Sequence, residues 1–121
     1  MTIAEFSLVA LDCRDPLALA GFYQKIVGGE IESQTDDGSW VKLKIDSASD
    51  MGFQLDPDHQ APSWPDGLPQ QAHLDFDVVD LDEGERQVVG IGARKADVQP
   101  QPEDWRVFLD PAGHPFCLVR A

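Results

Sequence analysis

The residues best suited to chemistry are His73 and Asp75, which lie two positions apart in the alternating segment AHLDFDVV. Residues two apart in a β-strand project from the same face, so this carboxylate could orient the imidazole. An oriented imidazole can act as a general base. The plainer interpretation is a histidine that only hydrogen-bonds to its neighbours, and the sequence leaves both open.

Tryptophans form the second candidate group. Trp40 begins the segment WVKLKI, and Trp105 begins the similar segment WRVFLD about 65 residues later. The two indoles could wall a site that stacks planar ligands or holds a cation over a ring face. They could equally fill a core or cover a dimer seam. Trp64 lies among prolines, where we expect an exposed aromatic side chain rather than a mobile lid.

Other potential donors are expected to have structural roles. The sequence DPDH over residues 56–59 holds Asp56, Asp58 and His59, but we interpret it as a solvated turn. His114 follows the turn-forming sequence DPAG and is also expected to be structural. In the expected first strand, Cys13 lies on the same face as Val9 and Leu11, which favours packing in the core.

An internal repeat predicts how these residues are positioned. The stretch 8–28 is similar to the stretch 73–92, about 65 residues later. Each copy begins with an expected strand, which is followed by an acidic residue and then by a helix-length segment that ends at glycine. Asp15 and Asp80 are the expected helix N-caps. We predict two βαβββ modules over residues 1–58 and 71–121, joined by a proline-rich linker over 59–70, as one structural domain. The expected strands cover 6–13, 30–34, 40–45, 51–55, 72–79, 93–98, 105–109 and 116–120, and the expected helices cover 16–27 and 81–91.

Composition excludes several classes of partner. The 121-residue chain has a net charge of −13 and only nine Lys and Arg residues, which argues against nucleic acid and anionic membranes. The charge is compatible with a cationic ligand or with solubility alone. No apolar run is long enough to span a bilayer, and the N-terminal residues lack the basic lead of a signal peptide. We therefore expect a cytoplasmic protein in which both cysteines are reduced.

Three segments carry a resemblance to a known family: LDCRDPLALAGFYQKIVGG, AHLDFDVVDLDEG and FLDPAGHPFCLV. In this order and spacing they resemble the vicinal-oxygen-chelate superfamily, which includes glyoxalase I, extradiol dioxygenases, fosfomycin-resistance enzymes and bleomycin-resistance proteins. The nearest likeness is to short glyoxalase-like proteins of unassigned function. The resemblance implies an α+β fold in which tandem βαβββ modules form a curved mixed sheet around a cup, with the helices on the convex face. It also implies a homodimer.

The resemblance further implies four positions that converge in the cup, where the family's metalloenzymes hold a divalent ion. In this sequence they fall on Leu8, Gln54, His73 and Cys117. His73 is a strong ligand, Gln54 is a weak oxygen donor, Leu8 has no donor, and Cys117 suits only a soft metal. We therefore expect no tightly held metal and no other cofactor.

Two functions from different classes follow. The first is a bleomycin-resistance-like protein that binds a small organic ligand, cationic or aromatic, without a tightly held metal. Its ligand-binding residues would be Leu8, Trp40, Gln54, Trp105 and Cys117. The alternative is a lyase, isomerase or dioxygenase-like enzyme that uses His73 as metal ligand, or as general base together with Asp75.

Overall fold

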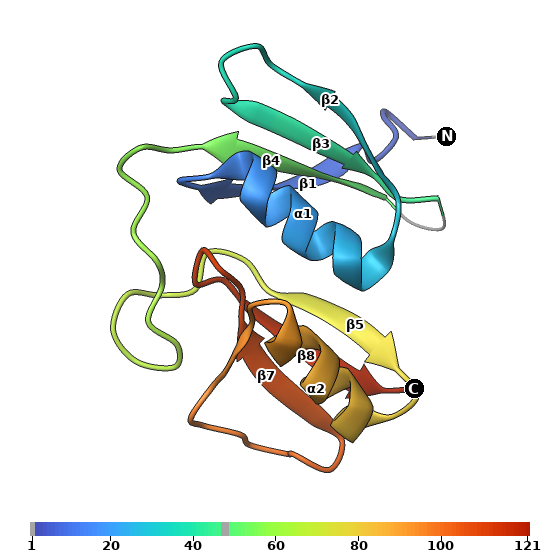
Figure 1. Cartoon of the computed structure of the whole chain (residues 1–121), viewed down its shortest axis with the longest axis vertical. Coiled ribbons are helices and arrows are strands. Elements are labelled where there is room, and N and C mark those ends of the chain that lie inside the picture. Colours follow the sequence, from blue (N-terminus) through green and yellow to red (C-terminus); the bar gives the residue numbers. More distant parts are fainter. Residues whose placement is uncertain (1, 47–48) are drawn as a thin grey trace. The chain divides into compact units, whose positions relative to one another are not determined.

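The computed structural model describes residues 2–46 and 49–121, and these form two compact units, Met1–His59 and Gln60–Ala121 (Figure 1). The proline-rich segment after His59 therefore groups with the second unit. Each unit has the element order βαβββ, which confirms the predicted α+β class and the two tandem modules. The predicted cup between the modules stays a prediction.

The first unit comprises one helix and a four-stranded sheet. Its sheet has the strand order β1-β4-β3-β2, in which β1 runs parallel to β4 and the other pairs are antiparallel. The helix α1 lies on one face of this sheet (Figure 1). The elements are β1 (Leu8–Cys13), α1 (Pro16–Val27), β2 (Glu30–Gln34), β3 (Trp40–Lys44) and β4 (Asp50–Leu55).

The second unit repeats this topology. Its sheet has the order β5-β8-β7-β6, with β5 parallel to β8 and antiparallel pairing elsewhere. The helix α2 again lies on one face (Figure 1). The elements are β5 (Leu74–Val78), α2 (Leu81–Gly90), β6 (Arg94–Lys95), β7 (Trp105–Leu109) and β8 (Pro115–Arg120).

Both helices begin at the predicted aspartates. The Asp15 carboxylate accepts a hydrogen bond from the Ala18 N–H at 3.1 Å, and Pro16 occupies the first turn. The Asp80 carboxylate accepts one from the Glu83 N–H, also at 3.1 Å. Each cap satisfies a backbone donor that has no partner within its helix. Among the described residues, neither helix is long and apolar enough to cross a membrane.

Each core lies between a helix and the face of the sheet it covers. In the first unit the Tyr23 ring of α1 stacks on Phe53 of β4, with ring centroids 5.9 Å apart. In the second unit Phe116 of β8 stacks on Phe108 and meets Phe76 edge-on. Consecutive strand residues face opposite sides, so these rings identify the helix-covered face of each sheet and leave the neighbouring residues on the open face.

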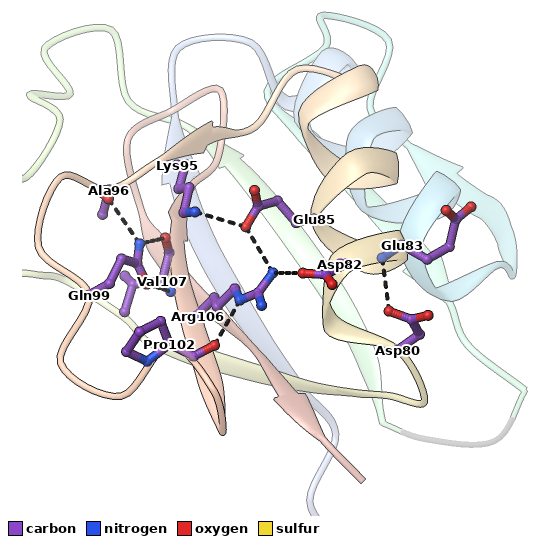
Figure 2. Close-up of polar contacts among 10 residues, drawn as sticks. All are labelled: Asp80, Asp82, Glu83, Glu85, Lys95, Ala96, Gln99, Pro102, Arg106 and Val107. Carbon is purple, nitrogen blue, oxygen red and sulfur yellow. Dashed lines mark hydrogen bonds and ion pairs between the residues drawn. The ribbon is translucent and has the colours of Figure 1, made fainter.

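Arg106 joins α2 to the second sheet (Figure 2). Its guanidinium lies 2.9 Å from the Asp82 carboxylate and 3.2 Å from that of Glu85, and its Nε donates to the Pro102 carbonyl at 2.8 Å. The side chain is 13% exposed. A planar guanidinium can serve several acceptors at once, which suits it to joining a helix, a strand and a loop.

The sixth strand is shorter than predicted, since it covers Arg94–Lys95 rather than residues 93–98. The Gln99 side chain takes the place of a longer ladder (Figure 2). Its amide nitrogen donates to the carbonyls of Ala96 and Val107 at 2.9 and 2.8 Å, and its oxygen accepts from the Val107 N–H at 2.9 Å. The Val107 N–H and C=O thus have hydrogen-bond partners beyond the end of β6, the strand that pairs with β7 on this side.

The first strand is also shorter than predicted, because β1 begins at Leu8 rather than Phe6. Its partner β4 begins at Asp50, directly opposite Leu8. The Phe6 side chain is 73% exposed. An apolar β-compatible residue therefore precedes the strand without joining the ladder.

Candidate functional site

The open face of the second sheet carries the candidate chemistry. On β5, Leu74, Phe76 and Val78 are partly buried, whereas Asp75 and Asp77 are exposed, as is His73 just before the strand, in agreement with the alternation of the sequence. On β8, Phe116 packs against Phe76, and Leu118 approaches Gly84 of α2. Cys117, which lies between them, therefore faces the open side, where His73 and Asp75 also lie.

His73 and Asp75 are in direct contact. His73 Nε2 lies 2.9 Å from Asp75 Oδ1, within hydrogen-bond distance. The His73 side chain is 37% exposed and that of Asp75 is 62% exposed. The predicted contact is present, and the imidazole remains partly exposed to solvent. A catalytic role for the pair stays a prediction.

Cys117 lies directly across the strand pair from Asp75. Parallel pairing of β5 with β8 sets Asp75 opposite Cys117. Burial raises the pKa of the Cys117 thiol to about 11, and the negative charge of Asp75 and a hydrogen bond to its carboxylate act in the same direction. The thiol is thus protonated at neutral pH and donates to the carboxylate.

His73, Asp75 and Cys117 together form a potential metal-ligating group. One nitrogen, one oxygen and one sulfur ligand atom from these side chains lie within 4.8 Å of one another. Within residues 2–46 and 49–121 no other group of three such side chains is brought together. His73 and Cys117 were expected as metal donors, whereas Asp75, the third member, was not. The signal was present, since Asp75 shares a strand face with His73.

Tryptophans border this group. Trp105 of β7 and Trp64, which precedes β5, pack with Val119 against a buried cluster of Ala96, Val107 and Cys117. Both indoles are only partly buried. Trp64 was expected to be an incidental exposed aromatic, and this expectation was wrong because its ring covers part of the open face. No local pattern shows this, since the contact joins residues more than thirty positions apart.

The open face of the first sheet carries the repeat counterparts of these residues. An offset of about 65 residues relates Leu8 to His73, Ala10 to Asp75, Gly52 to Cys117 and Trp40 to Trp105. Ala10 pairs with Gly52 just as Asp75 pairs with Cys117. The Trp40 ring covers Gly52 so closely that a Cβ added there would lie 2.2 Å from Cη2 of the indole. At the positions where the second sheet has its donors, the first sheet thus has apolar groups beneath an indole.

The remaining predicted site residues of the first unit are Leu8 and Gln54. Leu8 begins β1 and is partly buried. Gln54 is exposed on β4 and pairs with Trp40 and with Asp12 on its two sides. Leu8 pairs with Asp50, four positions before Gln54 along β4. That separation along a strand is about 13 Å. Ligand contacts by Leu8, Gln54 and Trp40 stay predictions.

Two sets of residues, the segment 56–59 and His114, were expected to have structural roles. Asp58 N–H donates to the Asp56 carboxylate at 3.0 Å, as expected of a turn. His59 is 6% exposed, so this end of the turn is buried rather than solvated, and its carbonyl accepts a hydrogen bond from Arg14 Nε at 2.8 Å. His114 is also buried, and its backbone closes a turn with Asp110.

Comparison with known proteins gives consistent results. A family model described as a glyoxalase-like domain matches residues 8–119. No curated protein matches the sequence. Among solved structures, a glyoxalase/bleomycin resistance protein/dioxygenase family enzyme from Burkholderia phytofirmans PsJN is 20% identical and has a TM-score of 0.73, with 97% of this chain and 98% of that chain covered.

Two further structures show the same likeness. A mutant of the fosfomycin resistance protein FosX from Listeria monocytogenes, complexed with Mn(II) and 1S,2S-dihydroxypropylphosphonic acid, is 17% identical with a TM-score of 0.70 over 98% of this chain and 90% of that chain. A glyoxalase/bleomycin resistance protein from Albidiferax ferrireducens is 16% identical with a TM-score of 0.60 over 96% and 98%. At these identities the likeness establishes a shared fold.

Proposed function

Because this chain belongs to the family of glyoxalase-like domains, we propose that it binds a small organic ligand on the open face of its second sheet, without a tightly held metal. The preferred ligand is planar and cationic. The observation that carries the proposal is the packing of Trp64 and Trp105 on the cluster that contains Cys117, beside the His73–Asp75 pair.

The apolar part of this face supports a planar ligand. Trp64 and Trp105 are partly buried against the floor of Val107 and Cys117, so their rings are held in place while some of their surface remains accessible. Flat aromatic groups stack on indoles in offset or edge-on arrangements. A cation over an indole face gains a further attraction.

The polar part of the face supports a positive charge on the ligand. Asp75 and Asp77 are exposed on the same side of β5, and the chain as a whole carries a charge of −13. An acidic surface raises the local concentration of cations and accelerates their association. His73 adds an adjustable donor or acceptor, and a few polar groups on an apolar floor are typical of small-molecule sites.

Direct titration tests the proposal. Protein freed of metal with a chelator would be titrated with bleomycin-type glycopeptides and a panel of aromatic cations, with tryptophan fluorescence and calorimetry as readouts. We expect saturable binding that is lost in Trp105→Leu and weakened in Asp75→Asn. Phe6→Ala, which alters an exposed aromatic outside both sheets, serves as the matched control and should bind normally. Absence of binding to every compound at millimolar concentration would refute the proposal.

The His73–Asp75 contact favours an enzyme as the second candidate. A carboxylate 2.9 Å from Nε2 holds the imidazole in one orientation and supports proton abstraction from a bound substrate by the other ring nitrogen. This is the lyase or isomerase alternative, in which His73 acts as a general base. If a substrate is identified by screening, His73→Gln should abolish turnover while binding persists. Unchanged turnover would exclude this role.

A further inference from the structure

Arg94 extends the proposed ligand site to the opposite edge of the second sheet. We infer that its guanidinium binds a carboxylate of the ligand. The preferred ligand is then a planar zwitterion, which has its cationic group at the β5 edge and its carboxylate at the β6 edge. This role of Arg94 rests on the proposed function, because it requires a planar cation on the open face of this sheet, and it adds a residue and a second charged group to that site.

Strand register places the Arg94 side chain on the open face. Arg94 pairs with Leu109 of β7. Lys95 pairs with Phe108, whose ring belongs to the helix-covered face. Because successive residues of a strand face opposite sides, Arg94 faces the open side and Lys95 faces α2. The ion pair between Lys95 and Glu85 of α2 agrees with this assignment (Figure 2).

Arg94 borders the floor on which the tryptophans pack. Ala96 lies two positions further along the chain, and its N–H donates to the Val107 carbonyl at 3.1 Å, so Ala96 faces the same side as Arg94. Trp64 and Trp105 pack on the buried cluster that contains Ala96. A ligand stacked on these indoles therefore lies within reach of the long, exposed side chain of Arg94.

The guanidinium of Arg94 is available for an external anion. In the part of the chain that the structure describes, it forms no hydrogen bond or ion pair. Each of the other arginines donates to a carbonyl or a carboxylate, and these arginines are Arg14, Arg86, Arg106 and Arg120. The chain has 22 Asp and Glu residues, yet none of those described neutralises Arg94. The planar fork of a guanidinium matches a carboxylate through two parallel hydrogen bonds.

The positions of the charged groups define the ligand. Asp75 and Asp77 lie on β5 and Arg94 lies on β6, at opposite edges of the sheet β5-β8-β7-β6. Three interstrand spacings separate the backbones of these edges, a distance of about 14 Å. A body of two conjugated rings with its charges at the two ends suits this span, because the side chains cover the remainder. A carboxylate suits Arg94 better than a phosphate, because a chain of charge −13 repels a single negative charge less than a double one.

A pair of fluorescent dyes tests the role of Arg94. The first is an N-methylstyrylpyridinium with a carboxylate on its distal ring. The second is the methyl ester of the same dye, which keeps the planar cation and has no negative charge. Each would be titrated with chelator-treated full-length protein, and dye fluorescence anisotropy would report binding. We expect the acid to bind roughly 3–10-fold more tightly than the ester, as for an accessible but bidentate charge pair. Added salt should reduce this preference.

Variants separate a contact with the carboxylate from a structural effect. Arg94→Gln should bind the two dyes equally, with no loss of affinity for the ester, because only the contact with the carboxylate is removed. Arg94→Glu should prefer the ester, since a like charge then faces the carboxylate. Lys95→Gln is the matched control, because it removes the same charge one position away, on the side that faces α2, and it should keep the wild-type preference. Circular dichroism would verify that each variant is folded.

Equal binding of acid and ester by the wild-type protein would overturn the role of Arg94. It would leave the proposed function in place, because the ester reports on that function alone. An acid preference that persists in Arg94→Gln, or that Lys95→Gln abolishes, would also overturn this role. If neither dye binds, the role of Arg94 fails together with the ligand site on which it rests.

Discussion

Asp75 and Cys117 are directly opposed in the parallel pair of β5 and β8, and the carboxylate of the first accepts a hydrogen bond from the thiol of the second. The two residues are 42 positions apart in the chain, yet their pairing brings an acid and a thiol together on the open face of one sheet. In the first unit Ala10 and Gly52 stand in the same relationship, with no functional group on either. The two sheets thus share a topology and differ in chemistry.

The ionisation of Cys117 should reveal its environment. Burial first, and Asp75 second, raise the pKa of this thiol to about 11. In a metal-free Cys13→Ser background, thiolate ultraviolet absorbance should therefore develop only near pH 11. Asp75→Asn removes the charge and the charged acceptor, so the pKa should fall, although burial keeps it above the ordinary value.

The same shift has a consequence for stability. A thiol whose pKa is raised by folding binds its proton more tightly in the folded state, so stability should decrease as pH rises from the ordinary thiol value towards about 11. Urea denaturation over this range would measure the decrease. Asp75→Asn should make the free energy of unfolding fall less steeply with pH. If both this pH dependence and the pKa of Cys117 are unchanged in that variant, the role given to Asp75 is contradicted.

Gly52 should not tolerate a side chain. Gly52→Ala would place a Cβ 2.2 Å from the Trp40 ring, which must then move. We expect the free energy of unfolding to fall by about 1–3 kcal/mol, the usual cost of overpacking. The fall should be smaller in a Trp40→Ala background, because the colliding ring is absent.

Gly21→Ala is the matched control for this substitution. Gly21 lies in α1, and a Cβ there would meet nothing within 4 Å. Replacing a helical glycine by alanine should raise stability by about 0.5–1 kcal/mol. If both variants shift the denaturant midpoint in the same direction relative to the wild-type protein, the assigned contact between Trp40 and Gly52 is refuted.

Arg106 should contribute to the attachment of α2. Arg106→Met keeps the aliphatic stem but removes hydrogen bonds and ion pairs to Asp82, Glu85 and the Pro102 carbonyl. We expect a loss of about 1–2 kcal/mol in the free energy of unfolding, because the guanidinium is largely shielded whereas its partner Asp82 is exposed to solvent. Chemical denaturation would measure it.

Arg86→Met provides the comparison for Arg106. Arg86 pairs with Glu83 on the solvent side of α2, and both side chains are well exposed. Solvent-exposed ion pairs contribute little, so this variant should be almost unchanged in stability. If Arg86→Met lowers the free energy of unfolding as much as Arg106→Met does, the contacts of Arg106 with α2 and with the Pro102 carbonyl do not explain its contribution to stability.

The sequence by itself determined the local elements and their repetition. Period-two alternation fixed which face of β5 carries His73 and Asp75, because the direction of successive side chains is a property of the strand backbone. Asp15 and Asp80 marked the helix starts because a cap acts within its own turn. The order of these elements, repeated twice, was enough to predict the family fold.

Only the tertiary structure decided what surrounds His73 and Asp75. Strand register set Cys117 opposite Asp75, and packing brought Trp64 onto the same face, while Gln99 replaced part of a predicted strand with side-chain hydrogen bonds. Each of these depends on partners distant in sequence or on the side chain of a loop residue. Local propensity does not encode such contacts, because they form only when separate strands and loops pack together.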